Sequence, residues 1–247
     1  MKVALFAPCY VDQLYPDVGM AAVRVLERLG VSIVVPDGAA CCGQPMANAG
    51  FARGADGVLE TFVDTFVAYE KIVVISGSCA AHVRHHATAF GERGRHVAER
   101  TVEFCAFLHD DIGVSRVAGL NVSLARRVAV HIGCHGLRGL GLAKPTELNI
   151  PPFDKVRALL ETVHGLTFAK ASRPDECCGF GGSFAVGEPA ISTRMGLDRL
   201  DEYASAQADT IVSTDVSCLM HLSGLARAGG AQTPMLHVAQ VLAGVPA

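Results

Sequence analysis

The sequence predicts an α/β fold made of two pseudo-symmetric βαβ-type repeats with parallel sheets, and three observations support this. Short apolar runs of strand length alternate with longer segments whose apolar residues recur at helical spacing, as in parallel βαβ units. One order of cysteines (a single residue, an adjacent pair, a single residue) occurs twice along the 247 residues. The chain is also 50% hydrophobic, which at this length is enough to bury a substantial core.

The cysteine pattern divides the chain into two predicted domains. We expect the first repeat to cover residues 1–124 and the second to cover residues 125–247. Eight of the nine cysteines follow the repeated order: Cys9, Cys41, Cys42 and Cys79 in the first repeat, and Cys134, Cys177, Cys178 and Cys218 in the second. The ninth, Cys105, is predicted to be a buried thiol within a helix.

Each repeat begins with an apolar strand that leads to its first cysteine. These strands are KVALFAP at 2–8 and RVAVHIG at 127–133. Amphipathic helices follow at 17–30 and 152–165, and each of these segments ends in a glycine, which favours a helix stop. The two repeats therefore open with matching strand–helix units.

The remaining elements also match in order between the repeats. The predicted segments are second strands at 31–37 and 166–171, helices at 56–70 and 190–207, and third strands at 71–78 and 210–217. Each second strand leads into a Cys-Cys-Gly loop, and short helical segments begin at the cysteines that follow the third strands.

The repeated cysteines all lie at or just after the carboxyl end of a predicted strand. Parallel strands bring these ends to one edge of the sheet, where ligands of such folds bind. We therefore expect each repeat to gather four thiols in one place. Buried inert thiols are the alternative, because free cysteine is common in cores, but such residues would be spread over strands and helices. A disulfide within an adjacent pair is geometrically poor, since neighbouring Cα atoms lie only about 3.8 Å apart.

Four gathered thiolates indicate a metal centre. Structural zinc commonly uses Cys-x-x-Cys pairs, whereas the cysteines here are adjacent or far apart in the sequence. Adjacent side chains point apart on an extended backbone and suit two metal atoms better than one, as in an iron–sulfur cluster. Gly43 and Gly179 follow the pairs and would let the backbone pass close to a bulky cluster. A zinc-stabilised scaffold remains the alternative.

The sequence motifs around the cysteines resemble those of a known family. The motifs are PCYVDQLYPDVG, CCGQP, SGSCAAHV, GCHGLRGLGL, CCGFGGSFAV and DVSCLMHL. They resemble the CCG-domain family, which includes the cysteine-rich component of heterodisulfide reductase, over essentially the whole chain. The resemblance is strongest to the lactate-utilization branch and extends to the iron–sulfur component of glycolate oxidase. It implies one iron–sulfur cluster of [4Fe-4S] type in each repeat, either cubane or non-cubane.

Both repeats depart from the Cys-x-x-Cys ending of the heterodisulfide reductase branch. The chain has Cys79-Ala-Ala-His82 in the first repeat and Cys218-Leu-Met-His221 in the second. Residues i and i+3 lie on the same side of a helix, so each imidazole can reach its cluster. His82 and His221 are therefore candidate metal ligands, and the alternative for each is a hydrogen-bond donor that does not touch the metal.

Two further histidines flank Cys134 in the second repeat. His135 follows it directly and is expected to lie beside the centre without binding the metal. His131 alternates along the preceding strand and is predicted to be a core histidine.

The motifs that are missing limit the function. No GxGxxG follows a strand and no ferredoxin-type cysteine run occurs, so we predict a subunit of an oxidoreductase complex rather than a self-sufficient enzyme. The resemblance implies oxidation of L-lactate to pyruvate together with a ferredoxin-like B-type subunit and a C-type subunit. The alternatives are a thiol/disulfide redox subunit like heterodisulfide reductase and a glycolate-oxidase-type subunit.

Charge and hydropathy indicate the compartment and exclude some partners. The net charge is −3 and the basic residues are scattered, which argues against nucleic acid as a partner. No apolar run is long enough to cross a membrane and no signal peptide is recognisable, so we expect a cytoplasmic protein with reduced thiols.

Overall fold

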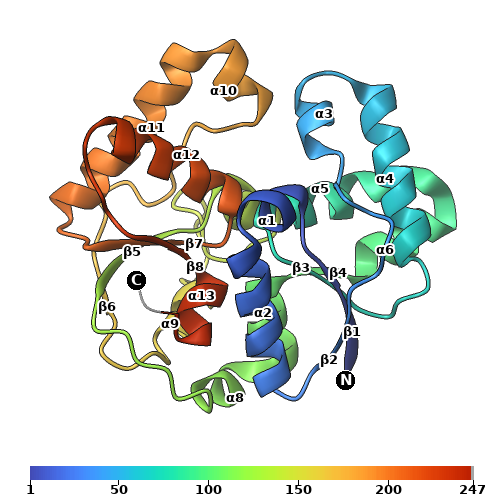
Figure 1. Cartoon of the computed structure of the whole chain (residues 1–247), viewed down its shortest axis with the longest axis horizontal. Coiled ribbons are helices and arrows are strands. Elements are labelled where there is room, and N and C mark those ends of the chain that lie inside the picture. The colour runs from blue at the N-terminus through green and yellow to red at the C-terminus, as the bar shows by residue number, and fades with distance from the viewer. Residues whose placement is uncertain (246–247) are drawn as a thin grey trace.

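The structure is a computed structural model that describes residues 1–245 and contains two four-stranded sheets, one in each half of the chain (Figure 1). The strand orders are β2-β1-β3-β4 and β6-β5-β7-β8, and the strands within both sheets pair in parallel. The strands are β1 (Lys2–Phe6), β2 (Ser32–Val34), β3 (Ile72–Val74), β4 (Thr101–Glu103), β5 (Arg127–His131), β6 (Thr167–Phe168), β7 (Thr210–Ser213) and β8 (Met235–His237). The predicted fold class of two matching parallel α/β repeats is confirmed.

The helices connect the strands and cover both sheets. They are α1 (Cys9–Leu14), α2 (Pro16–Arg28), α3 (Gln44–Asn48), α4 (Ala52–Phe66), α5 (Gly77–His86), α6 (Gly91–Arg100), α7 (Phe104–Ala106), α8 (Val114–Ala118), α9 (Lys155–Leu160), α10 (Ser183–Gly187), α11 (Pro189–Ser205), α12 (Val216–Ala228) and α13 (Val238–Ala243). A π-helical segment spans Phe107–Gly113. In the part of the chain described here, no helix is long and apolar enough to cross a membrane.

The third strands are shorter than predicted because capping residues start the next helices early. Ser76 Oγ accepts a hydrogen bond from the backbone N–H of Cys79 at 3.4 Å, at the start of α5. Asp215 caps α12 in the same way, because its carboxylate accepts a hydrogen bond from the backbone N–H of Ser217 at 3.1 Å. The cysteines after the third strands therefore lie in the first turn of a helix and not at a strand end.

Each sheet has one face covered by helices of its own half. In the first half, α4, α5 and α6 pack on the outer face, where Phe6 contacts the rings of Phe62 and Phe66. In the second half, α11 and α12 cover the outer face, and Tyr203 and Leu222 are buried there. Alternation along a strand explains the two faces, because successive side chains point to opposite sides.

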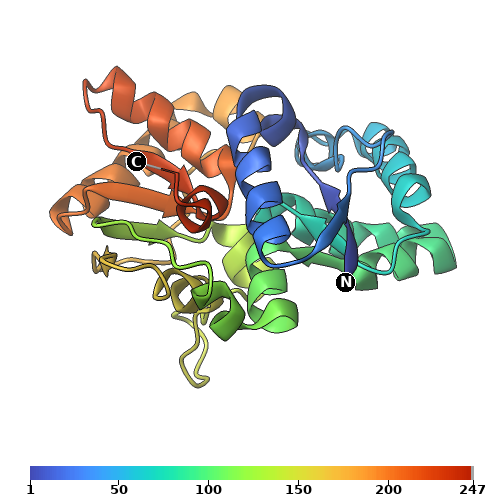
Figure 2. The same cartoon turned by 60° about the horizontal axis from the view of Figure 1, so that its bottom comes forward.

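The opposite faces of the two sheets contribute to one shared core. Val3 and Leu5 of β1 belong to the same cluster of buried residues as Val128 of β5 and Val212 of β7. Helices α2 and α13 pack against each other between the halves, as Figures 1 and 2 show. The two repeats therefore form one packed body, and the exact boundary between residues 124 and 125 stays a prediction.

Candidate metal centres

The eight repeated cysteines lie in the segments that follow the carboxyl ends of the parallel strands. Cys9 begins α1 directly after β1, the first pair follows β2, and Cys79 lies in the first turn of α5 after β3. The second half repeats this arrangement with Cys134 after β5, its pair after β6 and Cys218 in α12 after β7. All nine cysteines of the chain are free thiols.

The four thiols of the first half come together as two close pairs. Cys9 Sγ lies 3.9 Å from Cys41 Sγ, and Cys42 Sγ lies 3.1 Å from Cys79 Sγ. Tetrahedral metal sites with metal–sulfur bonds of about 2.3 Å hold their sulfur atoms about 3.8 Å apart. The sulfur atoms therefore lie at separations from which they can share metal atoms with small side-chain movements.

The four thiols of the second half are arranged in the same way. Cys178 Sγ lies 3.1 Å from Cys218 Sγ, the same separation as between the equivalent atoms of the first half. Cys134 and Cys177 form the other pair, and a hydrogen bond between them, together with burial, raises the pKa of Cys134 far above its usual value.

Thiols of both halves line a single cavity at the junction of the two repeats. The cysteines on its wall are Cys9, Cys42, Cys79, Cys134, Cys177, Cys178 and Cys218. Cys41 does not line this cavity, but its Sγ lies 3.9 Å from Cys9 Sγ, which does. The sequence predicts a group of thiols in each repeat, but it does not predict that the two groups face each other across one space.

One thiol in each half has the most strongly lowered pKa, and in the second half a hydrogen bond from Cys178 also lowers the pKa of Cys218, to about 7. Hydrogen bonds from Cys42 and Cys9 hold the pKa of Cys41 far below its usual value. In the second half, hydrogen bonds from Cys134 and Cys178 lower the pKa of Cys177 in the same way. A deprotonated sulfur is the form that binds a metal.

The glycine after each cysteine pair is required by the backbone. Gly43 has φ +91° and Gly179 has φ +87°, in the left-handed region that favours glycine. A Cβ atom would lie 2.9 Å from the carbonyl oxygen of Ala55 at Gly43, and 2.7 Å from that of Ser192 at Gly179. The close approach is therefore to helices α4 and α11 rather than to the cavity. The backbone N–H groups of these two glycines point at sulfur atoms; for example, Gly43 N lies 3.4 Å from Cys41 Sγ.

The candidate histidines His82 and His221 sit at equivalent places beside the Cys-Cys-Gly loops. His82 is buried, burial lowers its pKa to about 4, and its Nε2 has no hydrogen-bond partner within residues 1–245. His221 is half-buried, and its Nε2 lies 3.3 Å from the carbonyl oxygen of Ser192. Neither ring is within hydrogen-bonding distance of a cysteine among the contacts of the described chain. Metal ligation by these two residues stays a prediction.

His135 lies at the cavity wall, as its position after Cys134 suggests. Its Nδ1 is 3.5 Å from Cys134 Sγ, and its Nε2 is 3.1 Å from the side-chain amide nitrogen of Gln44 in the first half. The ring therefore links a sulfur of one repeat to the Cys-Cys-Gly loop of the other.

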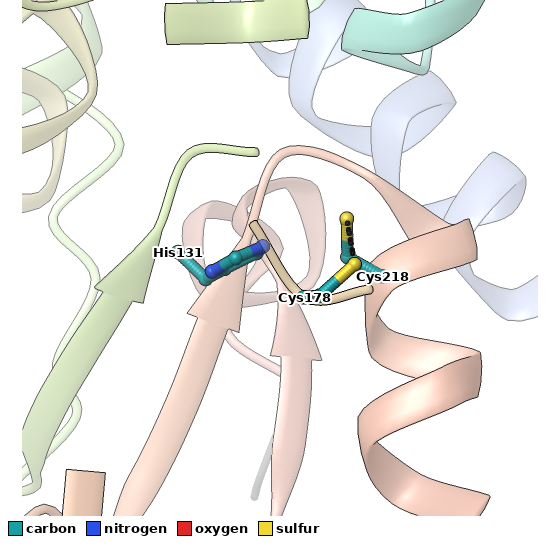
Figure 3. A group of neighbouring side chains, drawn as sticks. All are labelled: His131, Cys178 and Cys218. Carbon is teal, nitrogen blue, oxygen red and sulfur yellow. Dashed lines mark hydrogen bonds between the residues drawn. The ribbon is translucent and has the colours of Figure 1, made fainter. Parts of the chain in front are cut away.

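His131 is the residue whose place the sequence interpretation missed. It is buried as a core histidine should be, but a ring nitrogen lies within 4.8 Å of both Cys178 Sγ and Cys218 Sγ (Figure 3). Its Nδ1 is 2.7 Å from the hydroxyl oxygen of Tyr203. Burial lowers the pKa of His131, but Tyr203 and Cys218 outweigh this and raise it to about 10. The signal in the sequence is its spacing before Cys134, which equals that of Phe6 before Cys9.

Asp215 joins the two cysteine-bearing helices and was also not predicted. One carboxylate oxygen accepts hydrogen bonds from the Ser217 hydroxyl at 2.6 Å and the Ser217 N–H. The other accepts from Ser78 N at 2.8 Å and from Ser76 Oγ at 3.1 Å, both in the first half. The amino ends of α5 and α12 are thereby held together beside the cavity.

The donor set fits an iron–sulfur centre in each half. Each group supplies four thiols, one of them strongly acidic, with backbone N–H groups directed at sulfur. Each half also has a buried imidazole whose Nε2 has no geometrically defined hydrogen bond in the described chain, His82 in the first half and His131 in the second. Cys105, by contrast, is fully buried at α7 and away from the cavity, as the sequence predicts.

Comparison with known proteins agrees with this duplicated site. The family model described as "CCG: Cysteine-rich domain" matches residues 3–84 and 128–223, once in each half. The chain belongs to the CCG cysteine-rich domain family. The two matches carry the two groups of repeated cysteines.

Curated members of the CCG family are similar to this chain over nearly their whole length. Lactate utilization protein A of Bacillus cereus (strain G9842) is 35% identical over 248 residues, covering 98% of both chains. Lactate utilization protein A of Bacillus thuringiensis (strain Al Hakam) and lactate utilization protein A 2 of Bacillus anthracis (strain CDC 684 / NRRL 3495) show the same identity and coverage. The likeness therefore extends to the full architecture and not to one repeat alone.

Proposed function

We propose that this chain is the iron–sulfur electron-transfer subunit of a complex that oxidises L-lactate to pyruvate. The single observation that carries the proposal is the gathering of four thiols from three separate loops in each half, on a chain that matches lactate utilization protein A end to end. Glycolate would be the hydroxy acid in the alternative complex suggested by the glycolate oxidase resemblance.

The eight repeated cysteines would hold one cluster of [4Fe-4S] type in each repeat. When bound, such clusters accept and release single electrons. The protein's own part is to supply thiolates and to direct the N–H groups of Gly43 and Gly179 at Cys41 and Cys177. Burial of Cys42 and Cys178 keeps bulk water away from the inner edge of each group. Hydrogen bonds to sulfur and burial both tune the reduction potential.

The chain is proposed to work with partner subunits. A two-electron oxidation of a hydroxy acid needs a hydride or proton–electron acceptor, and this sequence contains no nucleotide-binding glycine motif for such a cofactor. We therefore assign substrate oxidation to a complex with a ferredoxin-like B-type subunit and a C-type subunit. The cytoplasm, where thiols remain reduced, is the proposed compartment.

Anaerobic purification of the full chain tests the proposal. We expect a brown protein with iron and acid-labile sulfide in comparable amounts and broad visible absorbance that lactate bleaches only when the partner subunits are present. A colourless protein with stoichiometric zinc would overturn the iron–sulfur assignment in favour of a scaffold.

The shared cavity favours a second candidate function. Sulfur ligands of both halves surround one space, where a small disulfide could meet both centres, as in a heterodisulfide-reductase-like protein. The reduced protein would then transfer electrons to a small disulfide without partner subunits. Lack of any disulfide reduction by the reduced, cluster-loaded protein would rule this candidate out.

A further inference from the structure

The two halves differ in the side chain that lies beneath the thiols. Phe6 ends β1 three residues before Cys9, and His131 ends β5 three residues before Cys134. Both side chains point to the outer face of their sheet. Phe6 packs edge-on against Phe62 and Phe66, with ring centroids 4.9 and 5.7 Å away. The first half therefore offers only carbon at a place where the second half offers nitrogen.

A hydrogen bond at one nitrogen of the His131 imidazole fixes the orientation of the ring, and the other nitrogen is available to a ligand. Its Nδ1 is 2.7 Å from the Tyr203 hydroxyl, and both residues are buried. Its Nε2 is buried and makes no hydrogen bond of normal geometry in residues 1–245, and the polar group beside the ring there is the thiol of Cys218. Figure 3 shows the edge of the ring facing the sulfur atoms of Cys178 and Cys218. A buried polar atom without a partner is costly, so such an atom calls for a ligand.

We propose that His131 binds the metal centre of the second half through Nε2, next to Cys178 and Cys218. The proposal rests on the proposed iron–sulfur function and goes beyond its eight cysteine ligands. A ring nitrogen of His131 and the two sulfur atoms all lie within 4.8 Å of one another. Small side-chain movements would bring them to the roughly 3.6–3.8 Å that separates two ligands of one tetrahedral metal atom.

Tyr203 acts as a positioning residue for this ligand. Metal-binding histidines almost always donate their other ring N–H to a neighbouring oxygen, which fixes the tautomer and the ring orientation. Without a metal, Tyr203 and Cys218 favour the protonated ring, so metal binding at Nε2 releases the proton of that nitrogen. Nδ1–H then donates to the Tyr203 hydroxyl oxygen and fixes the ring orientation. Arg199 lies over the Tyr203 ring, 4.6 Å from its centroid, and holds the ring in place.

The consequence is a chemical difference between the two centres. The first centre has sulfur ligands above a cage of phenylalanine rings, whereas the second has a nitrogen ligand in addition. The identity of the ligands and the hydrogen bonds around them set the reduction potential of such a cluster. The two centres are therefore expected to differ in reduction potential.

Pulsed electron paramagnetic resonance of the reduced, cluster-loaded full chain tests the proposal directly. We expect a strongly coupled nitrogen signal that changes when histidine is labelled with 15N. The signal should disappear in His131→Leu and persist in His221→Leu and His82→Leu, which remove the two other candidate histidines. His131→Cys supplies a sulfur in place of the nitrogen, so it should keep the iron content of the wild type and lose the signal.

The outcomes separate this proposal from the proposed function. Iron-loaded wild type without a strong nitrogen coupling, or a coupling that survives in His131→Cys, overturns the His131 assignment and leaves the iron–sulfur function intact. Coupling that is lost instead in His221→Leu or His82→Leu also overturns it. A wild-type chain that holds no iron overturns the proposed function itself.

Discussion

The first and second halves share a backbone plan but surround their thiols with different chemistry. Both halves place Cys-Cys-Gly after the second strand and a capped helix after the third. Phe6, Phe62 and Phe66 lie beneath the thiols of the first half. His131, Tyr203 and Arg199 occupy the corresponding layer of the second half and are buried as well. The duplication thus keeps the positions of the sulfur atoms while the groups behind them diverge.

This difference shows which parts of the repeat are fixed by the centre and which are free to tune it. The paired cysteines, the left-handed glycines and the close sulfur contacts occur in both halves, with Cys42–Cys79 and Cys178–Cys218 separations of 3.1 Å each. The layer behind them sets the local dielectric and the hydrogen bonds, which are the means by which proteins adjust metal potentials.

Removal of one paired cysteine should have the largest effect and should act on one half at a time. We expect Cys42→Ser and Cys178→Ser each to lower the iron content by about half, because each change disables the ligand set of one centre. Iron and acid-labile sulfide per chain are the measurements. Cys105→Ala is the matched control, since this buried thiol lies away from the cavity and should leave iron unchanged. Unchanged iron in both serine variants would contradict the assignment of two centres.

The fourth strands of the two halves offer a contrast in pH dependence. Glu103 and His237 end β4 and β8, and each caps the next helix from a buried position. Burial raises the pKa of Glu103 to about 7. Burial also lowers the pKa of His237 to about 4.

These two shifts act on stability with opposite signs. The contribution of Glu103 is present below its unfolded pKa and is lost as pH rises through about 7. That of His237 is present above its unfolded pKa and is lost as pH falls through about 4. Relative to Glu103→Gln, the wild type should lose up to about 3 kcal/mol of unfolding free energy from pH 4.5 to 7. Relative to His237→Asn, it should gain a similar amount from pH 4 to 6.5. Urea denaturation at several pH values measures both, and parallel curves would disprove the shifts.

A glycine-to-alanine pair compares the two Cys-Cys-Gly loops. Gly179→Ala should destabilise more than Gly43→Ala, because its Cβ would meet Met195 Cβ and Ser192 O, both at 2.7 Å, rather than one oxygen at 2.9 Å. Backbone strain of this kind costs about 1–3 kcal/mol. Gly50 has φ +80° with open space around it, so Gly50→Ala measures the cost of the backbone conformation alone, without a steric contact. Thermal or urea unfolding should rank the three variants, and equal losses would mean that the contacts are unimportant.

The smallest expected effect is that of Tyr203→Phe. It removes the hydroxyl that lies 2.7 Å from His131 Nδ1 while keeping the ring. One lost hydrogen bond costs about 1 kcal/mol, and the first half has no equivalent bond to lose because Phe6 stands at that position. Equilibrium unfolding measures the loss of stability. Phe62→Leu changes the apolar layer of the first half instead, and it should leave any nitrogen coupling of the metal centre unchanged. A wild-type-like stability of Tyr203→Phe would show that the hydroxyl does not hold the imidazole.

The strand-and-helix order of both halves could be predicted from the sequence because the signals are local. Apolar runs such as KVALFAP and amphipathic segments such as residues 56–70 carry their own periodicity. Strands β4 and β8 were not predicted because they run directly into α7 and α13, with no turn residues to separate a strand from the helical pattern that follows. Their pairing depends on neighbours in the sheet rather than on their own residues.

The thiol groups could be predicted, but their surroundings could not. Parallel strands bring Cys9, Cys79 and the intervening pair to one edge in any such fold. That both groups face one cavity depends on how α2 packs against α13, which no local pattern encodes. His131 occupies a strand position that usually belongs to the core, so only its distance to Cys178 and Cys218 reveals a second role.

Anomalous diffraction at the iron absorption edge, from crystals of the full chain grown without oxygen, tests the central claim most directly. Two separate iron peaks should appear beside the shared cavity, one against Cys9, Cys41, Cys42 and Cys79, and the other against Cys134, Cys177, Cys178 and Cys218. A single peak between the halves, or thiols that bind zinc instead, would contradict the account.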